Sequence, residues 1–367
     1  MADSYFQIAT TPRLYVSYPL WMYATLGTND IYDSLAIPFS GSGGFVSKED
    51  HIKLMQLDPS NTITWDFVQD EGSDNGFLYY NTTKALQVES VEDSWNYDFI
   101  MFLGHNFASS NYHPKIKSWN GSLDNSSSTD LNMEGVVNHN STYPPQYDGW
   151  SLANITDFPS DWSENILQIV LQADQTVDEA ELGPVSLGSI AFGKKYVFPQ
   201  NCRINTKTKF NYGVKQKQTH SGKTISNAKW TRPSSWIGEP FGLGESGGSA
   251  NFRRSGLREW TVEFDSLEPS KVMPQNLMTN SNGYTLQDNH EAAANGTDSK
   301  YNINNGTDFF SSVVNRTLAN HLPMVLQIDK DDYSPSGFAL VRMRENYEII
   351  QKSSNLYNIK VTFVEQV

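Results

Sequence analysis

The feature that most constrains the fold is a short apolar run at residues 97–106. Within it, apolar side chains occupy both alternating sets of positions, with Phe99 and Met101 on one side and Ile100 on the other. A strand with apolar side chains on both faces is typically buried on both faces. We therefore expect an interior strand of a sheet, ended at Gly104, where the missing Cβ lets the chain turn.

Two further runs, 166–172 and 185–192, have the length and apolar content of neighbouring strands. Shorter apolar fragments between residues 22 and 75, such as 51–55, are separated by Gly, Ser, Asn and Asp and are also typical of strands. Aromatic residues make up 13% of the chain, which favours β structure. We expect a mostly-β protein whose first part is a β-sandwich.

Length and charge both indicate two domains. The chain has 367 residues, more than one domain usually holds. Residues 1–200 contain 8 Lys and Arg against 25 Asp and Glu, a net charge of −17, whereas residues 201–367 contain 19 against 16, a net charge of +3. We therefore predict domains at 1–201 and 202–367, with the boundary at Cys202. Cys202 is the single cysteine of the chain, so an internal disulfide is excluded.

The second domain is predicted to be a β domain with one packed helix. Apolar and polar residues alternate in 258–264 and again in 357–363, which predicts two strands with one packed face each. A helix is expected near 308–320, because Thr307 or Asp308 can cap it and apolar residues follow at helical spacing. Long Asn- and Gly-rich stretches predict exposed loops.

The start of the second domain is strongly basic. Residues 203–258 contain 11 Lys and Arg against two acidic residues. Period-two alternation predicts a strand at 206–217 with a packed face and a solvated face. The packed face would carry Phe210, Tyr212 and Val214, and the solvated face Lys207, Lys209, Lys215 and Lys217. A turn at 220–222 and a return strand through Thr224, Ile225 and Trp230 would complete a long hairpin.

Three interpretations of the lysine face remain open. Lysines along a strand keep it from pairing with other sheet edges, so the face can be a solvated, protective one. It can also be a rim that docks an acidic neighbour, including the N-terminal half of another copy. Binding of nucleic acid is the interpretation we favour least, because the chain is acidic overall and the lysine face lacks interleaved aromatic side chains for stacking.

Motifs that indicate catalysis or metal binding are incomplete. Gly244-Glu-Ser246-Gly-Gly248 lacks the strand and helix that a nucleophile elbow needs. Ser221-Gly-Lys-Thr224 lacks the first glycine of a phosphate-binding loop. Asp329, Asp331 and Asp332 are followed by neither the Gly nor the Glu of a calcium loop, and the seven histidines lack metal-ligand spacing. We expect no enzyme, no cofactor and no metal.

The chain also lacks the patterns of membrane insertion. No apolar run approaches the ~18 residues that a spanning helix requires. The first residues contain no basic segment followed by an apolar one, so no signal peptide is expected. We expect a soluble protein without a membrane partner.

The apolar strand closing in Gly104-His-Asn106, followed by the runs 187–193 and 196–199, resembles the galactose-binding-like (discoidin-type) jelly roll of structural proteins in tailed bacteriophages, over residues 13–200. The strands at 256–267 and near the C-terminus are similar to those of distal-tail and baseplate proteins. The resemblance implies a jelly-roll sandwich in a structural protein of the virion tail, tail tip or baseplate. It also implies a homo-oligomer, assembled in the host cytoplasm with other tail proteins.

A host-recognition module that binds carbohydrate is the alternative function. Trp119 and Trp150 are predicted on long loops, where indole rings can stack on the sugars of a host surface glycan. Loop tryptophans are also typical of loop anchors and interfaces. No residue of this sequence matches a sugar-binding residue of the jelly-roll family.

Overall fold

A computed structural model gives the structure of the chain in two compact units. Within the described residues, one unit is formed by residues 17–195 and is called the inserted unit. The other is formed by residues 10–16 together with 196–366 and is called the terminal unit. The structure describes residues 10–26, 47–67, 75–81, 97–120, 128–156, 165–203, 206–228, 256–273, 307–334, 337–344 and 347–366.

This division differs from the domains predicted at 1–201 and 202–367. Residues 10–16 belong to the terminal unit because β1 (Arg13–Tyr15) pairs antiparallel with β17 (Met324–Gln327). The chain re-enters the terminal unit at Tyr196, before Cys202. The change in net charge near residue 201 therefore lies close to residue 196, where the chain returns to the terminal unit. It does not indicate the passage into the inserted unit at residue 17.

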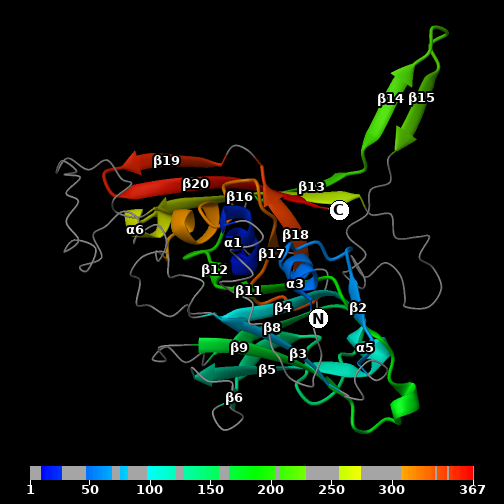
Figure 1. Ribbon diagram of the computed structural model, residues 1–367. Coiled ribbons are helices and arrows are strands. Elements are labelled where there is room, and N and C mark those ends of the chain that lie inside the picture. Colours follow the sequence, from blue (N-terminus) through cyan, green and yellow to red (C-terminus); the bar gives the residue numbers. More distant parts are fainter. Residues whose placement is uncertain are drawn as a thin grey trace, which may run out of the picture. The chain divides into compact units, whose positions relative to one another are not determined.

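Two four-stranded antiparallel sheets form the inserted unit (Figure 1). The first has the order β11-β4-β8-β7 and the second the order β3-β9-β5-β6, and a separate pair joins β10 to β2. The strands are β2 (Ile63–Trp65), β3 (Asn75–Asn81), β4 (Phe99–His105), β5 (Tyr112–Asn120), β6 (Ser128–Asp130), β7 (Met133–Val137), β8 (Gly149–Ile155), β9 (Asn165–Ala173), β10 (Val185–Leu187) and β11 (Ser189–Gly193).

The predicted interior strand is confirmed. Strand β4 lies between β11 and β8, and its residues Phe99 to Leu103 are fully buried. Ile100 and Phe102 belong to one apolar cluster with residues of β9 such as Ile169, so the two sheets share a core and form a sandwich. Gly104 does not end the strand as expected: with φ at 69° it lies in a β-bulge before His105, and a Cβ there would overlap the Pro59 carbonyl oxygen.

Among its described residues, the inserted unit contains the helices α1 (Tyr18–Leu26), α3 (Lys48–Met55) and α5 (Phe107–Ser110). Residues 51–55, expected as a strand, lie in α3. The Ser47 hydroxyl accepts a hydrogen bond from the Asp50 backbone N–H, so it caps the helix, and Glu49 adds negative charge to the first turn. Leu54 and Met55 then pack into the same apolar core as β4.

An eight-stranded antiparallel sheet dominates the terminal unit, and the prediction of a mostly-β protein is confirmed. The order is β12-β1-β17-β18-β20-β16-β13, and β19 also pairs with β20. The predicted strands at 258–264 and 357–363 lie in β16 and β20, which pair with each other. The remaining strands of the sheet are β12 (Lys195–Val197), β13 (Lys207–Asn211), β16 (Leu257–Leu267), β18 (Phe338–Met343), β19 (Glu348–Ser353) and β20 (Leu356–Glu365).

The helix predicted near 308–320 is shorter than expected. Asp308 does cap it, because its Oδ1 accepts the Ser311 backbone N–H at 2.9 Å. The helical part is one π-helical turn, η6 (Phe310–Val314), followed by turns in which Leu318 and Ala319 have positive φ. Such left-handed residues cannot continue a right-handed helix. A second short helix is α6 (Pro269–Val272).

Candidate interaction surface

Strands β14 (Val214–Gln218) and β15 (Thr224–Ala228) form a two-stranded antiparallel sheet of their own (Figure 1). Their turn is closed by the Thr219 backbone N–H, which donates to the Lys223 carbonyl at 2.8 Å. Gly222 takes the left-handed conformation that the turn requires, with φ at 81°. Residues 214–228 are called the ribbon below. The incomplete phosphate-loop motif at 221–224 is thus part of a β-turn.

The long basic strand predicted at 206–217 is divided. Its first part, β13, pairs with β16 as an outer strand of the eight-stranded sheet. Gly213 then has φ at 60°, and its N–H donates to Asn211 Oδ1 at 2.9 Å, which turns the chain before β14 begins. Lys207 and Lys209 therefore lie on the sheet, and the other two lysines of the predicted face lie on the ribbon.

The pairing register gives the ribbon two chemically different faces. Residues directly opposite each other in an antiparallel pair share a face. Lys215 lies opposite Asn227 and Lys217 opposite Ile225, so one face carries both lysines, and it is called the cationic face. On the other face, the described side chains are all uncharged, those of Val214, Gln216, Gln218, Thr224 and Ser226.

The expected packed face is exposed, so that prediction is wrong. Phe210 is 52% exposed, Tyr212 38% and Val214 53%. The alternating pattern correctly separates Val214 from the lysines of the ribbon. It fails to show burial because β13 is an outer strand and, in the part of the chain that the structure describes, the ribbon has no second sheet layer.

The ribbon combines exposed apolar area with unbalanced positive charge. Residues 214–228 contain three lysines and no Asp or Glu. A two-stranded sheet alone is marginally stable in water, because it buries too little apolar surface. Its charged face attracts anionic partners, and its apolar side chains gain free energy when a partner covers them. Apart from His220 in the turn, residues 214–228 contain no ring on which a base could stack.

Of the two tryptophans proposed for sugar binding, the structure describes the side chain of Trp150 only. Trp150 lies in β8 and is fully buried, so it cannot stack on a carbohydrate, and its expected position on a loop is wrong. The apolar sequence of β8 pairs it into the sheet beside β4, where Trp150 lies opposite Leu103. Trp119 lies in β5, and its side chain is outside the described part of the structure.

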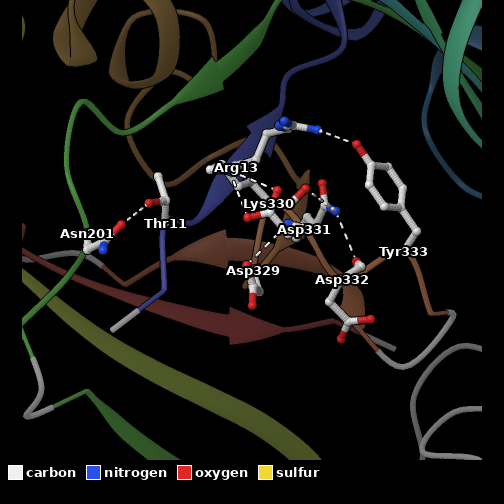
Figure 2. Close-up of polar contacts among 9 residues, drawn as sticks. Thr11, Arg13, Asn201, Asp329, Lys330, Asp331, Asp332 and Tyr333 are labelled. Atoms are coloured by element: carbon white, nitrogen blue, oxygen red, sulfur yellow. Dashed lines mark hydrogen bonds and ion pairs between the residues drawn. The ribbon is translucent and has the colours of Figure 1, made fainter. Parts of the chain in front are cut away.

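The aspartates considered for calcium lie in the turn between β17 and β18 (Figure 2). Asp329 Oδ1 accepts the Asp331 backbone N–H at 3.1 Å, and Asp332 Oδ1 accepts the Ser334 N–H at 2.9 Å. Lys330 Nζ lies 2.7 Å from an Asp331 carboxylate oxygen. The carboxylates therefore serve the turn itself, and the described residues include no group of three His, Cys, Asp or Glu that could hold a metal.

Histidines in the inserted unit are buried and poor bases. Burial lowers the pKa of His105 to about 3 and that of His139 to about 4. His105 Nδ1 accepts the Phe107 backbone N–H at 3.3 Å, as expected for a side chain near a strand end. Both rings are stacked, His105 on Phe107 and His139 on Phe102. Ser246 lies outside the described residues, so the expectation that it is not a nucleophile stays a prediction.

No protein-family model, no curated protein and no solved structure matches this chain. The resemblance to phage tail proteins therefore stays a prediction. None of the described helices is long and apolar enough to cross a membrane.

Proposed function

We propose that this protein is a structural component of a larger assembly and acts through protein–protein contact rather than catalysis. The observation that carries the proposal is the ribbon: among the described strands, its two strands pair with each other and with no third strand, and they present side chains to water on both faces. Neither apolar core formed by the described residues includes the ribbon. A partner that covers it would supply the missing layer.

The partner surface in this proposal is acidic. Lys215 and Lys217 share one face with the exposed Ile225, so a complementary surface would offer carboxylates around an apolar contact. Charge pairs of this kind set orientation and association rate, and they weaken with salt because screening acts over about 8–10 Å near physiological ionic strength. The setting implied by the family resemblance is a phage tail, tail tip or baseplate, where repeated copies meet neighbouring proteins.

Incorporation into particles tests the proposal. The ribbon variant Lys215→Glu/Lys217→Glu reverses the cationic face, and the control Lys271→Glu/Lys352→Glu makes the same change in net charge at two other exposed lysines of the terminal unit. All of these side chains are exposed, so the fold should be retained, as circular dichroism would check. In a host that produces particles, the wild type and the control should sediment with particles and the ribbon variant should stay in the supernatant.

Two results would contradict the proposal. Equal incorporation of the ribbon variant and the control would exclude the cationic face as a contact. Binding of the wild type to duplex DNA at sub-micromolar concentration, with a steep loss on adding salt and a loss in the ribbon variant, would favour nucleic acid as the partner instead.

A further inference from the structure

The chain itself carries an acidic surface of the kind the ribbon would bind. Residues 118–193 include 11 Asp and Glu and not one Lys or Arg. They form strands β6 to β11 of the inserted unit. The ribbon of the terminal unit has the opposite bias, since its charged side chains are all lysines.

The most concentrated acidic segment is the turn between β9 and β10. Residues 174–181 include four Asp and Glu, and this segment is called the acidic turn. Asp178 and Glu181 are exposed. Hydrogen bonds from the Thr176 backbone and hydroxyl lower the pKa of Asp174, so this carboxylate is charged over the whole range near neutral pH.

The acidic turn is anchored near both of its ends by hydrogen bonds to residues 110 and 111. The Asp174 N–H donates to the Asn111 carbonyl at 2.9 Å, and Asn111 Nδ2 donates to the Glu181 carbonyl at 3.0 Å. The Gly183 N–H donates to the Ser110 carbonyl at 3.2 Å. A surface fixed in this way loses little conformational freedom when a partner binds, which favours association.

We propose that the cationic face of the ribbon in one copy binds the acidic turn of a second copy. The inference rests on the proposed function and names its partner. Lys215 and Lys217 would face Asp178 and Glu181, and the exposed Ile225 would be covered by the same contact. Because ribbon and turn are different surfaces, the contact is heterologous, and each copy offers one of each. Copies would therefore join head to tail, into a closed ring or an open filament.

A charge exchange between two variants tests this contact with the full-length chain. The first variant is Lys215→Glu/Lys217→Glu and the second is Asp178→Lys/Glu181→Lys. The wild type should form oligomers in low salt that dissociate as salt is added, as measured by sedimentation velocity and light scattering. Each variant alone should associate about a hundredfold more weakly, since like charges meet at the contact. An equimolar mixture should form oligomers again, because the reversed ribbon meets the reversed turn and each native surface meets its native partner.

Milder variants guard against effects on folding. Lys215→Gln/Lys217→Gln and Asp178→Asn/Glu181→Gln remove charge without repulsion and should weaken association less than the reversals do. A matched control, Gln216→Glu/Gln218→Glu, adds negative charge to the opposite face of the same strand. It should weaken association less than reversal of the cationic face. Equal losses from the two faces would overturn the assignment of the contact to the lysines.

Two further outcomes would overturn the inference. A wild type that stays monomeric at high micromolar concentration in low salt excludes the second copy as partner. A mixture of the two variants that stays monomeric while the wild type oligomerises shows that copies meet elsewhere. Either result leaves the proposed function standing if the ribbon variant still fails to enter particles, whereas normal incorporation of that variant contradicts the proposed function itself.

Discussion

Two antiparallel strand pairs of the terminal unit have the same hydrogen-bonding pattern and opposite surroundings. In the pair β16–β20, Trp260 lies opposite Phe363, Val262 opposite Val361, and Phe264 opposite Ile359, and all six side chains belong to one buried core. In the ribbon, β14 and β15 pair with equal regularity, but every described side chain of β14 is exposed.

The difference shows that backbone pairing alone does not decide whether a strand pair stabilises the fold or remains available to a partner. Hydrogen bonds between strands replace hydrogen bonds to water and contribute little net stability, whereas burial of apolar side chains contributes most of it. The pair β16–β20 therefore stabilises the unit, and the ribbon leaves its side chains available to a partner. The following variants would break or sharpen this contrast.

The largest effect is expected in the core of β16. Phe264 is fully buried and its ring stacks on Phe198 with centroids 3.9 Å apart. Phe264→Ala should lower the free energy of unfolding by about 3–5 kcal/mol, because it removes apolar contact and leaves a cavity. Ile225→Ala in the ribbon should change it by less than about 0.5 kcal/mol. Urea unfolding measures both, and similar losses at the two positions would contradict the contrast.

A smaller loss is expected at the end of the same pair. Arg258 Nη2 lies 2.8 Å from Glu365 Oε1, and both side chains are buried. Glu365→Gln leaves the buried guanidinium without its counter-charge and should cost about 3 kcal/mol. The matched control is Glu259→Gln, whose partner Arg344 is 57% exposed, and it should cost less than about 1 kcal/mol. Equal losses in thermal or urea unfolding would show that burial does not separate the two pairs.

Acid should lower the stability of the fold through the buried histidines, and the ribbon should not contribute to this loss. Burial holds the pKa of His139 at about 4, below its unfolded value near 6.5, so the unfolded chain binds more protons between these values. The stability that the neutral His139 ring contributes is therefore fully present above pH 6.5 and is lost as the pH drops toward 4. At pH 4.5 the free energy of unfolding should be lower by about 2 kcal/mol because of His139 alone. The His139→Phe variant should lose less stability on acidification than the wild type.

The control for this prediction lies in the ribbon turn. His220 is exposed, so His220→Gln should change the free energy of unfolding at pH 7 by less than about 0.5 kcal/mol. A His139→Phe variant with the wild-type dependence on pH would contradict the assignment of acid sensitivity to the buried ring. Urea unfolding at pH 7 and at pH 4.5 provides the comparison.

The smallest effect on stability is expected from reversal of the ribbon lysines. Lys215→Glu/Lys217→Glu should change the free energy of unfolding by less than about 0.5 kcal/mol, since both side chains are in water. The same variant should fail to assemble, so one substitution would abolish binding and leave the stability of the fold unchanged. A large loss of stability in urea would show that the ribbon takes part in the fold.

Local sequence pattern predicts burial well where a strand lies in the interior. The double-faced apolar run of β4 and the alternation in β16 both indicate the packing that is found, because side chains alternate faces along any strand. The positions of Phe210, Tyr212 and Val214 alternate with polar residues as the apolar positions of β16 do, yet Phe210 and Val214 are exposed. Period-two alternation records which residues share a face, and burial of that face depends on a second layer that comes from elsewhere in the chain.

Other features depend on distant contacts or on single residues. The pairing of β1 with β17 joins the two ends of the chain, and no local signal near Arg13 indicates it. The break at Gly213 divides the predicted lysine face, although glycine in a strand pattern is a known sign of a bend. Trp150 is predicted from the sequence to lie on a long loop, whereas the apolar residues after it extend β8 and place Trp150 in that strand.

Hydrogen exchange of the ribbon tests the central claim most directly. Backbone amides of residues 214–228 should exchange rapidly in the isolated protein, because no other described strand or helix covers the ribbon, and amides of β16 and β20 should exchange slowly. In the assembled state, amides of the ribbon should become protected while those of β16 and β20 stay as they were. Ribbon amides that exchange equally fast before and after assembly would contradict the claim that this element is the contact.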